Sequence, residues 1–158
     1  MKVSIIGGGS WGLALANVLS NNHHQVLVYD ISEKIVSKIN QLHICYQLDE
    51  DINKDIKATN NLKEAIDFSE TILFVVPTKV LRDALSSVIA ILDTPKLFIN
   101  AAKGIEPDTF MRVSEIFTQM VPKEYLKGFV ALSGPSHAEE VIKKMTTLVT
   151  CASETEED

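Results

Sequence analysis

The chain has 158 residues, of which 46% are hydrophobic, so it can bury one core and we expect a single domain. Its 21 acidic and 15 basic residues give a formal net charge of −6, which argues against a broad surface for nucleic acid. The sequence contains no run approaching the roughly 18 apolar residues of a membrane span and no basic leader, so we expect a cytoplasmic protein without a membrane span. Cys45 and Cys151 have no metal-binding or redox spacing, and we expect free thiols and no metal site.

The first twelve residues, MKVSIIGGGSWG, predict a buried strand that leads through a glycine turn into a helix. The strand is rich in β-branched residues, as expected in a parallel sheet that is covered on both faces. Gly7, Gly9 and Gly12 follow in G-x-G-x-x-G spacing, which suits a tight turn, a close approach to a diphosphate and close packing of helix on strand, respectively. The free amides at the start of the helix, near Ser10, would point at the phosphates.

An acidic residue stands where dinucleotide-binding motifs use one. Asp30 ends the next apolar run and lies 18 positions after Gly12, close to the roughly 20 expected of a carboxylate that accepts hydrogen bonds from an adenosine ribose. The alternative is a glycine turn without a ligand, followed by an Asp that only begins a turn. The strand before the motif, the helix after it and Asp30 together favour dinucleotide binding.

The rest of the chain alternates apolar runs with segments of helical periodicity. We expect helices at residues 10–19, 32–42, 62–66, 79–92, 111–120 and 136–144, and strands at 3–6, 25–30, 56–59, 71–77, within 96–104, at 128–132 and at 147–151, with a surface excursion at 43–55. This alternation predicts an α/β fold of the Rossmann type, with a doubly wound, mostly parallel sheet flanked by helices. Loops after the strands should converge on one crevice. We assign residues 1–152 to one dinucleotide-binding domain and residues 153–158 to an acidic, solvated tail.

Four segments resemble motifs of one enzyme family. They are GGGSWGLALA at 7–16, VVPT at 75–78, AKGIE at 102–106 and SGPSHAEEV at 133–141, and they occur in the family's order. On these motifs the chain resembles the NAD(P)-dependent sn-glycerol-3-phosphate dehydrogenases. The resemblance implies the NAD-binding N-terminal domain of an enzyme that interconverts sn-glycerol 3-phosphate and dihydroxyacetone phosphate by hydride transfer, for glycerophospholipid synthesis.

The resemblance also implies particular contacts. Position by position, it places Ser10, Trp11, Pro77 and Ala138 at the cofactor, Lys103 between cofactor and substrate, and Gly134 and Ser136 at the substrate phosphate. Lys103 would supply three donors and a positive charge, although an ordinary surface lysine is the alternative. Ser136 would be an N-cap whose hydroxyl and neighbouring amides bind an anion, with plain helix capping as the alternative.

Three positions depart from the family's usual pattern. Leu13 stands where the family usually has Thr, and His137 replaces an aromatic residue. Asp30 stands where many bacterial members have a basic or polar residue that suits a 2′-phosphate. A carboxylate there would accept from two ribose hydroxyls and repel an additional phosphate, so we predict NAD(H) as the cofactor, with NADP(H) less favoured.

In this family a helical second domain follows and supplies a lysine general acid/base. We expect that domain to be absent from this chain. We therefore expect no catalytic residue in this chain, and weak dinucleotide binding without turnover. The expected partner is a small phosphorylated triose or glycerol substrate, and homo-oligomerisation is left open. Two other functions also stay open: a non-catalytic dinucleotide-binding or redox-sensing module, and the cofactor domain of another hydroxy-acid dehydrogenase.

Overall fold

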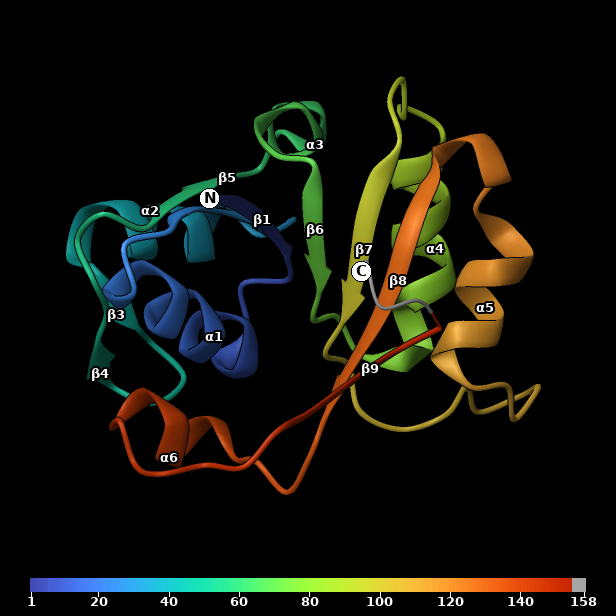
Figure 1. The fold of residues 1–158 in the computed structure, drawn as a ribbon. Helices are drawn as coiled ribbons and strands as arrows, with labels where there is room; N and C mark the ends of the chain where they lie inside the picture. The colour runs from blue at the N-terminus through green and yellow to red at the C-terminus, as the bar shows by residue number, and fades with distance from the viewer. Residues whose placement is uncertain (155–158) are drawn as a thin grey trace.

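A computed structural model describes residues 1–154. Within them a seven-stranded sheet has the order β5-β2-β1-β6-β7-β8-β9 (Figure 1). The strands of this sheet are β1 (Lys2–Ile6), β2 (Gln25–Tyr29), β5 (Lys57–Thr59), β6 (Thr71–Phe74), β7 (Lys96–Asn100), β8 (Leu126–Ser133) and β9 (Thr150–Ser153). A separate hairpin consists of β3 (Ile44–Cys45) and β4 (Glu50–Asp51).

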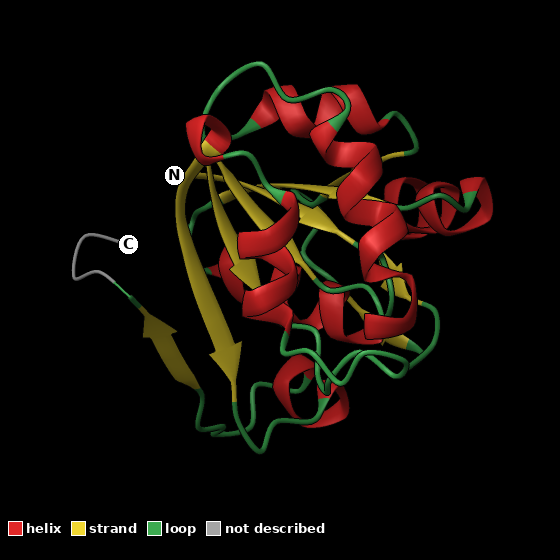
Figure 2. Cartoon of the chain, turned by 90° about the vertical axis from the view of Figure 1, so that its right-hand side faces the viewer, coloured by secondary structure: helices red, strands yellow, loops and turns green. Residues whose placement is uncertain are grey.

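The helices pack around the sheet, as Figure 2 shows. They are α1 (Ser10–Asn21), α2 (Glu33–Leu42), α3 (Leu62–Phe68), α4 (Thr78–Ile89), α5 (Val113–Met120) and α6 (Ala138–Ile142), with a 3-10 helix at Lys123–Tyr125. Among the described residues, no helix has the length and apolar character that crossing a membrane requires.

The strand order reverses direction beside β1. This strand pairs in parallel with β2 on one side and with β6 on the other. The chain first builds outward from β1 to β2 and β5, then returns to add β6, β7 and β8 on the opposite side. Loops after β1 and β6 therefore diverge and leave a crevice at the carboxyl ends of the strands. The doubly wound, mostly parallel α/β sheet that the sequence predicts is confirmed.

Each face of the sheet has its own hydrophobic layer. Along β6 every residue is buried, and successive side chains enter opposite layers, with Leu73 on the α1 side and Phe74 on the side of α4 and α5. The layer on the side of α4 and α5 contains three fully buried phenylalanines, Phe74, Phe98 and Phe117. Burial on both faces explains why these strands are continuous apolar runs.

The last strand differs from the sequence prediction in position, and its direction was not predicted. β9 starts at Thr150, not at residue 147, and pairs antiparallel with β8, with Ser133 opposite Thr150. A strand parallel to β8 would need a crossover that returns the chain to the amino ends of the strands. Instead α6 packs against α1 at the carboxyl edge, so the chain re-enters from the end of β8 (Figure 1). β9 also includes Ser153, which we had placed in the tail; residues 155–158 of that tail lie outside the described residues.

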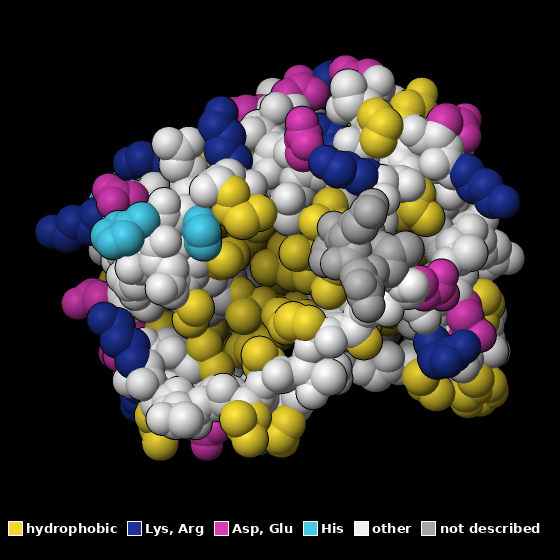
Figure 3. All heavy atoms as spheres, viewed as in Figure 1, with side chains coloured by type: hydrophobic (Ala, Val, Ile, Leu, Met, Phe, Trp, Pro, Cys, Tyr) yellow, Lys and Arg dark blue, Asp and Glu magenta, His cyan; other side chains and the backbone are white. Residues whose placement is uncertain are grey.

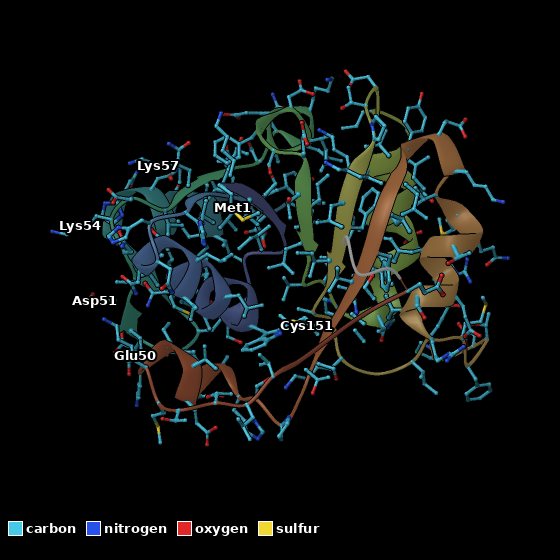
Figure 4. All side chains as sticks on the ribbon, viewed as in Figure 1. Met1, Glu50, Asp51, Lys54, Lys57 and Cys151 are labelled. Atoms are coloured by element: carbon cyan, nitrogen blue, oxygen red, sulfur yellow. The ribbon has the colours of Figure 1, made fainter. Side chains whose placement is uncertain are left out.

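The predicted surface excursion at 43–55 is partly buried. The hairpin places Cys45 and Ile52 in the core beside α1 and α2, and burial raises the pKa of the Cys45 thiol. Lys143, just after α6, forms an ion pair of 3.2 Å with Glu50, which Figure 4 labels on the hairpin. The excursion therefore helps to hold α6 in place.

One face of the molecule keeps an apolar groove. Figure 3 shows hydrophobic side chains gathered in a hollow between α1 and β8. A groove of about 420 Å³ in this region is lined by residues of α1, β8 and the segment 141–149, among them Leu15, Val18, Leu132, Met145 and Val149. Exposed apolar surface of this kind could not be located from the sequence.

Candidate functional site

The glycine turn joins β1 to α1 in the geometry that its spacing predicts. Gly7 has a φ of +117°, which favours glycine, and its amide donates to the carbonyl of Tyr29 at 2.9 Å. A Cβ on Gly12 would lie 2.0 Å from the Gly7 carbonyl oxygen, so only glycine lets α1 start this close to β1. A Cβ on Gly9 would meet nothing within 4 Å, which leaves open space beside the turn.

The start of α1 has free hydrogen-bond donors. Its N-cap is Gly9, and within this fully described helix no side chain caps the first turn and no acidic residue stands in it. The first amides and the positive end of the helix dipole are therefore available to an anion in the open space beside Gly9. This arrangement fits a diphosphate.

A first cavity, of about 360 Å³, lies on one side of the turn. Its lining comes from the ends of β1 and β2, the loop after β6, α3 and α4: Ile6, Gly7, Tyr29, Asp30, Ile31, Leu62, Val76, Val80, Asp83, Ala84 and Ser87. Asp30 also holds the turn, because Oδ2 accepts from the Gly8 amide at 2.8 Å and Oδ1 accepts from the Ser32 amide at 2.8 Å. Each oxygen keeps a further lone pair for a hydroxyl donor.

A second cavity, of about 370 Å³, lies where the loops after β1, β6, β7 and β8 meet. Its lining is Ser10, Trp11, Val75, Val76, Pro77, Ala102, Lys103, Ser136, His137, Ala138 and Glu139. Six of the predicted site residues, far apart in sequence, are thus brought together. Gly7 lines the first cavity and Ser10 the second, so the glycine turn lies between them.

Lys103 is held across the second cavity. Its ammonium donates a hydrogen bond to the Ser136 carbonyl and lies 5.3 Å from the centroid of the Trp11 ring. The indole of Trp11 is fixed in turn, because its Nε1 donates to the Ala101 carbonyl at 3.0 Å. The described lining of the cavity therefore includes one lysine, whose ammonium group has three donors.

A family model described as the N-terminus of NAD-dependent glycerol-3-phosphate dehydrogenase matches residues 2–158. The chain belongs to this family. A glycerol-3-phosphate dehydrogenase [NAD(P)+] of Onion yellows phytoplasma is 49% identical over 154 residues, which are 97% of this chain and 46% of that protein. The enzyme of the same name from Acholeplasma laidlawii is 48% identical over 156 residues, or 99% of this chain and 46% of that protein.

Solved structures of glycerol-3-phosphate dehydrogenases share the fold. The enzyme from Coxiella burnetii superposes with a TM-score of 0.87 at 24% identity, over 99% of this chain and 47% of that one. The yeast enzyme gives 0.82 at 24% identity, over 100% of this chain and 48% of that one. The chain thus spans about half the length of the glycerol-3-phosphate dehydrogenases it matches.

Two residues that the resemblance to glycerol-3-phosphate dehydrogenases had placed at the substrate phosphate have unexpected surroundings. Ser136 is not a helix N-cap, because α6 begins at Ala138 with His137 at the N-cap; Ser136 is buried instead, and its carbonyl binds Lys103. Gly134 is not part of the second cavity's lining. A Cβ there would lie 2.7 Å from the Leu148 carbonyl oxygen at a φ of +148°, so this glycine admits the chain that leads into β9. The prediction that Ser136 is an N-cap is therefore wrong.

Two polar groups that shape the site were missed. Asn100, at the end of β7, accepts from the Ala102 amide at 3.2 Å and donates to the Ala102 carbonyl at 3.1 Å, which fixes the residue before Lys103. Glu106 is 8% exposed and accepts two bonds from Arg82 of α4, from Nε at 2.6 Å and from Nη2 at 3.0 Å. An Asn at the end of an apolar strand was a usable signal. The Arg82–Glu106 pair had none, because its members are 24 positions apart.

The Arg82–Glu106 pair gives a pH-dependent prediction. The Arg82 guanidinium, and after it the Thr109 hydroxyl, hold the pKa of the Glu106 carboxyl below its ordinary value. Since the folded pKa lies below the unfolded one, the stabilisation is complete above the unfolded pKa and is lost as the pH falls through the folded pKa. Glu106→Gln should therefore lower the free energy of unfolding at pH 7, and its difference from the unsubstituted chain should narrow between about pH 5 and pH 3. Urea unfolding followed by circular dichroism measures this, and an equal difference at pH 7 and pH 3 would contradict it.

Proposed function

We propose that this chain binds NAD(H) across its glycine turn, as the cofactor-binding half of an enzyme that interconverts sn-glycerol 3-phosphate and dihydroxyacetone phosphate. One observation carries the proposal: the uncapped start of α1 lies between two cavities. Asp30 lines the first cavity and Lys103 lines the second. A dinucleotide has a matching arrangement, with a diphosphate between an adenosine and a nicotinamide nucleoside.

Each part of the site would have a separate task. The first amides of α1 would bind the diphosphate, and Asp30 would accept from the hydroxyls of the adenosine ribose. Lys103, in the second cavity, would donate to the nicotinamide nucleotide and to an oxygen of the phosphorylated substrate, whose negative charge it would offset. When bound, the nicotinamide ring supplies the carbon that accepts or gives up the hydride.

Turnover would need more than these residues provide. Hydride transfer requires a group that takes the proton of the substrate hydroxyl and a wall that holds the substrate against the nicotinamide. The matched relatives are about twice as long as this chain, and we assign both tasks to the part of those enzymes that it does not cover. We therefore expect the chain alone to bind dinucleotide and to show no appreciable dehydrogenase activity.

The lining of the first cavity favours NAD(H) over NADP(H). Asp30 and Asp83 both line it, and its described lining includes no lysine or arginine. A 2′-phosphate on the adenosine ribose would bring negative charge close to a carboxylate that already binds the turn. Two like charges 4 Å apart near a protein surface repel each other by about 1 to about 4 kcal/mol, which is enough to set a preference of at least about fivefold.

Calorimetric titration of the chain with NADH and NADPH tests both proposals. We expect NADH to bind and NADPH to bind at least about fivefold more weakly. Asp30→Asn should reduce the difference, because the charge is gone while the amide oxygen can still accept from Gly8, although the Ser32 amide loses its acceptor. A folded chain that binds no NADH would refute dinucleotide binding, whereas equal affinities for the two cofactors would refute only the preference.

A further inference from the structure

Lys103 lies in a short exposed span that is fixed at both ends. On its amino side, the buried Asn100 makes two hydrogen bonds with Ala102. The next residues, 103–105, are exposed, and Gly104 has a φ of +97°. Glu106 then returns to the interior. The direction in which Lys103 leaves the backbone therefore depends on the two flanking attachment points.

The attachment at Glu106 joins three elements. Both of its carboxylate oxygens are engaged, since Oε1 accepts from Arg82 Nε at 2.6 Å, while Oε2 accepts from Arg82 Nη2 at 3.0 Å and from the Thr109 hydroxyl. Arg82 also donates from Nη1 to Gln119 of α5 at 3.2 Å. Two parallel bonds between a guanidinium and a carboxylate fix orientation as well as distance. The loop after β7 is therefore held against α4 and α5.

The helix that carries Arg82 also borders the first cavity. Val80, Asp83, Ala84 and Ser87 of α4 line that cavity, while Arg82 holds the loop that presents Lys103 to the second. The ion pair thus connects the wall of one cavity with the cation of the other. Glu106 is ionised at neutral pH, and the Arg82 guanidinium lowers the pKa of its carboxyl further.

We propose that Glu106 and Arg82 are a positioning pair, which sets where the Lys103 ammonium lies in the second cavity. This inference rests on the proposed function, in which Lys103 acts at the junction of cofactor and substrate. The pair makes no contact with the cavity in its own right, because neither residue belongs to the cavity's lining. Its effect on binding is therefore indirect, through Lys103 or through the α4 wall of the first cavity, and we infer that the route through Lys103 dominates.

A double-mutant cycle tests this route. The dissociation constant of NADH is measured by calorimetry for the unsubstituted chain, Glu106→Gln, Lys103→Met and the double variant. We expect Glu106→Gln to weaken NADH binding by about fivefold or more when Lys103 is present, and by less than about twofold when Lys103 is Met. Arg82→Lys, which keeps the charge but loses the two-bond geometry, should give an intermediate loss that also disappears in the Met background.

A second ion pair supplies the matched control. Arg112 and Glu115 form an exposed pair of 3.1 Å at the start of α5, with side chains 74% and 44% exposed. Glu115→Gln makes the same chemical change away from Lys103 and should leave NADH affinity unchanged in both backgrounds. If Glu106→Gln prevents folding, Thr109→Val removes one bond to Glu106 and enters the same cycle in its place.

The outcomes separate this inference from the proposed function. Equal losses of affinity in the Lys103 and Met backgrounds would show that the pair acts only on the fold, and would overturn the inference while leaving the function intact. An unchanged NADH affinity in Lys103→Met would remove the role of Lys103 and the inference with it. Failure of the unsubstituted chain to bind NADH would refute the proposed function itself.

Discussion

Replacing Gly12 by alanine is expected to weaken NADH binding by about 100-fold or more, because losing two amide hydrogen bonds to a diphosphate costs about 1.5–3 kcal/mol each. The added Cβ would lie 2.0 Å from the Gly7 carbonyl oxygen, far inside any real contact, and the obstacle is backbone that cannot rotate away. The chain can relieve the clash only by moving α1 away from the end of β1. The amides that we propose for the diphosphate move with it. Calorimetry measures the loss, and circular dichroism reports whether the helices remain.

Gly9→Ala is the informative comparison for Gly12→Ala. Its Cβ would meet no protein atom within 4 Å, so it should fold with unchanged stability. The methyl group would nevertheless occupy the space beside the first amides of α1, where we place the diphosphate. We expect weaker NADH binding with no change in the urea midpoint. Affinity like that of the unsubstituted chain in Gly12→Ala would mean that the turn is not the binding element.

The second large effect is expected from Phe117→Ala, which should lower the free energy of unfolding by about 3–5 kcal/mol. Phe117 belongs to α5, and its side chain is fully buried against phenylalanines of the sheet. Its ring lies 5.2 Å from that of Phe74 in an edge-on arrangement and 4.9 Å from that of Phe129. Truncation removes these contacts and leaves a cavity between rigid neighbours. Because domains of this kind are stable by about 5–15 kcal/mol, the variant should lose a large share of its stability in urea unfolding.

Phe110→Ala provides the same substitution at the surface. Phe110 is 73% exposed, and we expect a change within about 0.5 kcal/mol. Comparable losses for the two variants would contradict the assignment of Phe117 to the core. A loss confined to Phe117 would locate the stabilising contacts in the layer beneath α4 and α5.

The parts of the fold that the sequence predicted are those with a local cause. The β-branched run before Gly7 is enough to predict a buried parallel strand, and the glycine spacing is enough to predict the turn after it. The distance from Gly12 to Asp30 reflects the length of one helix and one strand. The crevice followed from these elements, because loops after parallel strands share an edge of the sheet. Lys103 and Trp11 could be placed together on that basis, aided by the family motifs.

The parts that were missed depend on contacts between distant segments. The antiparallel direction of β9 follows from α6, which packs on α1 and keeps the chain at the carboxyl ends of the strands. The surroundings of Gly134 follow from the same return, which brings Leu148 against it. The helical pattern near Ser136 did not show that its hydroxyl would be buried. Arg82 and Glu106 meet only because α4 and the loop after β7 lie on the same side of the sheet.

Asp30 has two roles, and engineering a different cofactor preference would have to separate them. The carboxylate that faces the first cavity is also the acceptor for the Gly8 amide. Asp30→Arg would supply a positive charge for the extra phosphate of NADP(H). It would also leave the Gly8 amide without its acceptor and loosen the glycine turn that both cofactors need. Asparagine would be the better replacement, because its amide oxygen can still accept from Gly8 even though the Ser32 amide loses its acceptor, and the basic group would be introduced at another position on the cavity wall.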